Sequence, residues 1–79
     1  MHLHIVSPLR TLTYDIVWIE LNTNAGNFVI QSGHAPMLLI LAAHKEIIFR
    51  LKTGKDESLT IPQGVAEITR ESITIIMNE

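Results

Sequence analysis

β-branched side chains constrain the fold of this chain more than any other feature. Of 79 residues, 12 are isoleucine, 4 are valine and 7 are threonine. These side chains are stiff at their first torsion angle and pack well on a pleated sheet. No segment shows a sustained helical period, and no repeat or linker divides the chain. The sequence therefore predicts an all-β protein with a single domain over residues 1–79.

Apolar runs divide the chain into seven or eight expected short strands. Turn signals separate them every eight to twelve residues or so, which is typical of a β-sandwich or barrel. One run is continuously apolar and is compatible with a doubly buried strand or a short helix. We expect extended structure there because β-signals flank it on both sides. The expected strands are 2–7, 16–21, 28–31, 37–43 (the continuous run), 46–52, 57–61, 65–69 and 73–77.

Alternation predicts which side chains share a face of the sheet. In the first strand, Leu3 and Ile5 lie opposite His2, His4 and Val6. The run 16–21 divides in the same way into Val17, Ile19 and Leu21 on one face and Ile16, Trp18 and Glu20 on the other. The sequence leaves open whether the face with the indole is an outward protein-contact surface or is buried in a small sandwich.

Composition excludes several function classes. Six Lys and Arg residues spread along the chain, with a net charge of −2, exclude a strongly basic face for nucleic acid. The longest apolar run is shorter than the roughly 20 residues of a membrane-spanning helix. The N-terminal residues lack the basic start and long apolar middle of a secretory signal. The chain has no cysteine, which excludes disulfides and thiol nucleophiles and fits a reducing compartment.

No catalytic or metal-binding motif stands out. His2 and His4 share one face of a strand, but two imidazoles fall short of the three or four ligands of a zinc site. Ser32, His34 and Asp15 have no spacing that supports a catalytic triad. No pair of carboxylates falls in an expected apolar cleft. We therefore expect no enzymatic activity, cofactor or metal.

Three stretches in fixed order are similar to one known family. Residues 2–8, HLHIVSP, resemble its opening strand. Residues 26–38, GNFVIQSGHAPML, resemble its signature, in which a glycine-bearing turn leads to Gly-His-Ala-Pro-Leu-Leu. Residues 64–68 and 73–76 resemble its closing hairpin. The family is the epsilon subunit of F-type ATP synthases (delta in mitochondria), and the resemblance covers nearly the whole chain.

The resemblance implies a β-sandwich of about ten short strands, like the N-terminal domain of the epsilon subunit. It also implies a non-catalytic rotor subunit of the central stalk, which couples the gamma subunit to the c-ring in proton- or sodium-driven ATP synthesis. Such a subunit is peripheral, on the cytoplasmic face of the energy-transducing membrane. The alternative is a free-standing β-sandwich that binds a small ligand or an unrelated protein.

Two sets of contact residues follow from the resemblance. Ser7 and His34 match positions that face gamma in the family, and we expect Trp18 to report on the same contact. The loop that meets the polar loops of the c-ring is matched by Asn24, Ala25, Gly26, Asn27 and Phe28.

Several residues depart from the family pattern, and these departures motivate the alternative. Family members usually carry an acidic residue where Asn27 stands, so an ion pair with a basic c-ring loop does not carry over. Phe28-Val29 replaces a typical Leu-Gly, and residues 62–64, PQG, replace Ser-Gly-Gly. Longer members continue beyond the position of Glu79 into two helices that supply ATP sensing and inhibition. We therefore expect neither ATP sensing nor inhibition here. This holds whether the chain is a naturally short variant or a truncated one.

Overall fold

Eight β-strands form the regular structure of the chain, which the computed structural model describes over all of residues 1–79. They are β1 (His2–Val6), β2 (Thr11–Thr23), β3 (Gly26–Gln31), β4 (Met37–Ile40), β5 (Lys45–Leu51), β6 (Asp56–Ile61), β7 (Gly64–Ile68) and β8 (Ser72–Met77). The all-β prediction is confirmed. The eight strands agree with the seven or eight expected from the apolar runs and are fewer than the ten or so that the resemblance implies; one strand of 13 residues, β2, serves both layers.

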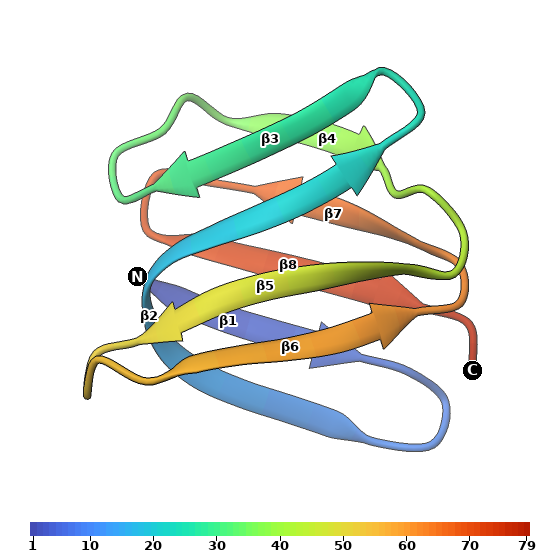
Figure 1. The fold of residues 1–79 in the computed structure, drawn as a ribbon, viewed down its shortest axis with the longest axis horizontal. Coiled ribbons are helices and arrows are strands. Elements are labelled where there is room, and N and C mark those ends of the chain that lie inside the picture. Colours follow the sequence, from blue (N-terminus) through green and yellow to red (C-terminus); the bar gives the residue numbers. More distant parts are fainter.

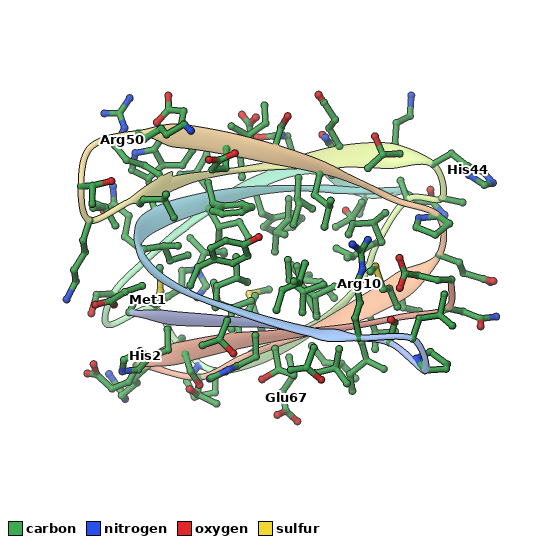
Figure 2. The ribbon with its side chains drawn as sticks, turned by 90° about the horizontal axis from the view of Figure 1, so that it is seen from below. Met1, His2, Arg10, His44, Arg50 and Glu67 are labelled. Atoms are coloured by element: carbon green, nitrogen blue, oxygen red, sulfur yellow. The ribbon has the colours of Figure 1, made fainter.

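The strands pack as two layers face to face (Figures 1 and 2). The first layer has the order β4, β7, β8, β1 and the first half of β2. The second layer has the order β3, the second half of β2, β5 and β6. All pairs are antiparallel except β1 with β8, which run parallel. The first half of β2, residues 11–15, was not among the expected strands, although it alternates polar and apolar residues and pairs with β1.

The interior is filled entirely by apolar side chains. Sixteen residues are buried, and none of them is polar or charged. Leu3 and Ile5 are fully buried, as alternation predicts, and in the register of β1 with β8 they lie beside Ile73 and Ile75. The ring of Phe49 packs against that of Tyr14 with 4.9 Å between centroids. Branched aliphatic side chains from both layers therefore make one continuous core.

A bulge in β2 changes the face of the predicted strand 16–21. The register with β5 shifts between Ile16 and Trp18, so that Val17 is an extra residue and is 47% exposed. Ile16 and Ile19 both point into the core despite being three residues apart. The prediction that grouped Val17 with Ile19 and Ile16 with Trp18 is therefore wrong, because a bulge breaks the period of two.

The continuous apolar run 37–43 is extended over residues 37–40, as expected, but Ala43 already lies in a turn and the strand is not doubly buried. Its first four residues form β4, an edge strand that pairs only with β7. Leu38 and Ile40 are 67% and 71% exposed, on the outer face of the first layer. Leu41 turns inward and forms a single bridge with Thr23, which joins the two layers at this edge.

Candidate partner-binding surfaces

The turn that was predicted to meet the c-ring is a tight hairpin between β2 and β3. Asn24 and Ala25 form its tip, and Thr23 pairs with Gly26 across it. The Thr23 hydroxyl donates to the Gly26 carbonyl (2.8 Å) and accepts from the Ala25 amide (3.1 Å). Gly26 has a φ of 128°, which side chains rarely adopt, so a glycine is required here. The sequence thus builds a turn that is rigid and whose tip is exposed.

Four of the five predicted c-ring residues are exposed, and the fifth is not. Asn24, Ala25, Gly26 and Asn27 face solvent, whereas the ring of Phe28 is half-buried against the core, opposite Leu21. Phe28 therefore anchors the base of the turn. Asn27 also holds the base of the turn, because its side-chain amide donates to Asn22 Oδ1 (3.0 Å).

An open hollow lies beside this turn, on the outer face of the first layer. Its floor is an aliphatic row in which neighbouring strands place side chains in register: Ile40, Val65, Ile76 and Val6. Asn24 from the turn contributes to its wall. Sequence reasoning missed this hollow because the row depends on the register of four strands. The only signal in the sequence was alternation along the last strand, which places Ile76 on the opposite face from Ile75 and Met77.

Ser7 lies at the rim of the same hollow, and its hydroxyl is already engaged. It accepts hydrogen bonds from the amides of Leu9 (3.3 Å) and Arg10 (3.2 Å), and it donates to the Glu79 carboxylate. Arg10 pairs with the same carboxylate at 2.8 Å. These contacts, the one from Ser7 above all, lower the pKa of Glu79 below its ordinary value. Ser7 therefore holds the β1–β2 turn to the end of the chain.

His34 lies at the opposite end of β3, in the turn that leads to β4. Its Nδ1 donates to the Ala35 carbonyl (2.8 Å), since a carbonyl can only accept, so Nε2 is the ring nitrogen left for a partner. The Gly33 amide donates to the Arg70 carbonyl (2.8 Å), which ties this turn to the β7–β8 turn. A shallow hollow here is lined by His34, Val29 and Gln31, among others.

Trp18 faces outward from the second layer, whereas Ile16, which was predicted to share its face, is buried. The tryptophan is partly buried, and it lies in register with Gln31 on one side and Arg50 on the other. The Arg50 guanidinium stands 5.4 Å from the centre of the indole ring. Arg50 is held in turn by two hydrogen bonds to Asp56 (2.6 and 3.0 Å), which lower the pKa of that carboxyl and raise the pKa of Arg50.

The predicted contact residues thus gather in two places. Gln31 links Trp18 and His34 at one end of β3, because it pairs with the tryptophan and lines the hollow of the histidine. The Asn24 turn and Ser7 lie by the other hollow, at the far end of β3. Six residues of strand separate the two ends, which corresponds to about 17 Å. The structure does not bring Ser7 together with the other two residues predicted to contact gamma.

Other candidate groups do not form a site. The rings of His2 and His4 lie 6.4 Å apart on the outer face of the first layer. No group of three or more His, Cys, Asp or Glu side chains is placed to hold a metal ion. Asp15 pairs with Lys52 at 3.4 Å and lies 3.8 Å from His2 Nδ1, and it makes no hydrogen bond or ion pair with Ser32 or His34.

A family profile matches the chain over residues 1–79, and its description is "ATP synthase, Delta/Epsilon chain, beta-sandwich domain". The chain belongs to this family. A curated relative, the ATP synthase epsilon chain of Microcystis aeruginosa (strain NIES-843 / IAM M-2473), is 33% identical over 78 residues, which cover 89% of this chain and 54% of the relative. The recognition made from GHAP and its flanking strands is therefore confirmed.

Solved structures share the fold. The mitochondrial ATP synthase of Euglena gracilis (OSCP/F1/c-ring) contains a chain with a TM-score of 0.83 and 19% identity, over 95% of this chain and 48% of that one. The central stalk/c-ring of the Tetrahymena thermophila mitochondrial ATP synthase contains another, with a TM-score of 0.84 and 15% identity, over 100% of this chain and 63% of that one. This epsilon-family chain spans about half to two-thirds of the length of these relatives. Its fold contains no helix with the length and apolar character that crossing a bilayer requires.

Proposed function

We propose that the chain is a non-catalytic subunit of the central stalk of an F-type ATP synthase, and that it couples gamma to the c-ring. Membership of the delta/epsilon family supports the assignment to an ATP synthase. The observation that supports the coupling role is that two separate hollows, each beside residues predicted to contact a partner, lie at opposite ends of β3. A body that joins two partners needs two such surfaces with a stiff connection between them.

The core supplies the stiffness of this connection. All sixteen buried residues are apolar, and protein interiors of this kind are close-packed and poorly compressible. Each contact surface is built on the ends of paired strands rather than on long loops. Torque applied at one surface therefore reaches the other without the two layers deforming. In this proposal the protein performs no chemistry and is held on the cytoplasmic face of the membrane only through its partners.

We assign the surface of Trp18 and His34 to gamma and the turn of Asn24, Ala25, Gly26 and Asn27 to the c-ring. The indole of Trp18 supplies an apolar aromatic surface and the ring of His34 a polar group at the same end of β3, and large aromatic side chains often anchor protein interfaces. Ser7 keeps its predicted contact with gamma only if gamma also reaches the rim of the larger hollow.

Reconstitution tests this function. The purified chain is mixed with gamma and the c-ring encoded in the same genome, and complexes are separated by size exclusion. We expect co-elution, weakened at the gamma contact by Trp18→Ala and by His34→Ala, with Ser58→Ala on the exposed face of β6 as the unaffected control. Thermal melting of each variant shows that the fold is intact.

Two results would contradict the proposal: no complex with either partner, or binding by both variants at wild-type strength. Purification of the ATP synthase from native membranes separates the rotor function from a free-standing module. A rotor subunit travels with the complex, whereas a free-standing binding module stays behind.

A further inference from the structure

Charge is distributed unevenly along this chain. Fourteen residues are Asp, Glu, Lys or Arg, and none of them falls between residues 21 and 44. This stretch forms the end of β2, all of β3 and β4, and the turns that join them, which lie together along one edge of the sandwich (Figure 1). Glu20 and Lys45 flank it directly. The turn assigned to the c-ring lies within the uncharged stretch.

The hollow beside that turn is uncharged as well, although most of its wall comes from other parts of the chain. Thirteen residues line it, seven of them hydrophobic, and none carries a charge at neutral pH. At its rim Ser7 contacts the Glu79 carboxylate, whose charge is paired with that of Arg10 at 2.8 Å. One backbone hydrogen bond, from Ala42 to Asn22 (2.9 Å), ties the base of the turn to the segment after β4. Two others, from Leu41 to Gly64 (3.0 Å) and from Asn78 to Gln63 (2.9 Å), join residues that line the hollow to each other.

We propose that the turn and the hollow form one neutral surface that receives an uncharged, aliphatic-bearing loop of the c-ring, and that no ion pair contributes to this contact. The proposal rests on the function proposed above and names the chemistry of one of its two partners. Ile40 and Ile76, 71% and 53% exposed, supply the apolar area that such a loop covers. Burial of that area is the driving force.

A neutral surface also discriminates between partners. A charged loop pressed against it would lose its hydration and gain no counter-charge, which is costly. Charges of either sign are therefore disfavoured on both sides of the contact. Salt screens charge pairs but leaves apolar burial intact, so the contact is insensitive to ionic strength.

Charge-scanning at one position tests the inference. Asn24 is exposed, lines the hollow and makes no side-chain hydrogen bond within the chain, so its replacement leaves the turn intact. Binding of the full chain to the detergent-solubilised rotor of gamma and c-ring is measured for Asn24→Asp and Asn24→Lys. Ser58→Asp and Ser58→Lys, on the exposed face of β6, are the matched controls.

We expect both Asn24 variants to weaken binding to the c-ring by more than tenfold, and both controls to bind as wild type. Wild-type affinity should change less than twofold between low and high salt. A steep salt dependence, or stronger binding by one Asn24 variant, would show a charged partner loop and overturn this inference alone. Unchanged binding by both variants would also overturn it. If the wild-type chain binds neither partner, the proposed function fails, and this inference fails with it.

Discussion

Two neighbouring isoleucines in β8 give the sharpest test of the sandwich. Ile75 is fully buried, beside Ile5 and Ala66, whereas Ile76 is 53% exposed on the opposite face. Replacement by alanine removes three carbons at either position. At Ile75 the lost transfer free energy is about 2.4 kcal/mol, and the cavity left behind raises the total to about 3–4 kcal/mol. At Ile76 roughly half of the side chain is already in water, so we expect about 1 kcal/mol.

The measurement is urea unfolding followed by circular dichroism, with melting temperature as a second readout. For a domain of this size, Ile75→Ala should lower the melting temperature by roughly 15–25 °C and Ile76→Ala by roughly 4–8 °C. The total stability of such a chain is about 4–12 kcal/mol, so the first variant approaches the limit of folding. Equal losses at the two positions would refute the assignment of inner and outer faces to β8.

Three further changes probe other features. His44 has a left-handed φ of 60°, so His44→Gly should stabilise the fold by about 0.5–1 kcal/mol in urea titration, whereas His44→Ala should not. A Cβ at Gly64 would lie 2.7 Å from the Ile76 carbonyl oxygen, so Gly64→Ala should lower the free energy of unfolding by about 1–3 kcal/mol; an unchanged urea midpoint would contradict this close approach. The pKa of Glu79 is lowered in the folded state, so its stabilising contribution is present above its unfolded pKa and is lost as pH falls through the folded value. The difference in urea midpoint between wild type and Glu79→Gln should therefore be present at pH 7 and disappear at strongly acidic pH.

Much of the fold follows from local patterns in the sequence. β-branched residues and turn signals predict the strands, and alternation places Leu3 and Ile5 inside. The bulge at Val17, by contrast, does not follow from a local sequence pattern. It is an extra residue that exists only through the pairing of β2 with β5, so simple alternation on a single strand cannot reveal it.

The candidate surfaces divide in the same way. The turns at Asn24 and at His34 can be predicted from the sequence, because both contain residues that favour turns and both fall within the stretch that resembles the family. The aliphatic row through Ile40 and Ile76 is invisible until the register of four strands is known. The position of Ser7 away from His34 is likewise a product of topology, since the two residues follow strands in different layers.

The parallel pairing of β1 with β8 also determines how the molecule bears load. The two chain ends emerge at opposite ends of these neighbouring central strands (Figure 1). A pull between the ends would therefore stretch the five residue pairs from His2–Ser72 to Val6–Ile76 all at once, in shear, instead of unzipping them one after another. Mechanical resistance in that direction is consequently shared across all five pairs.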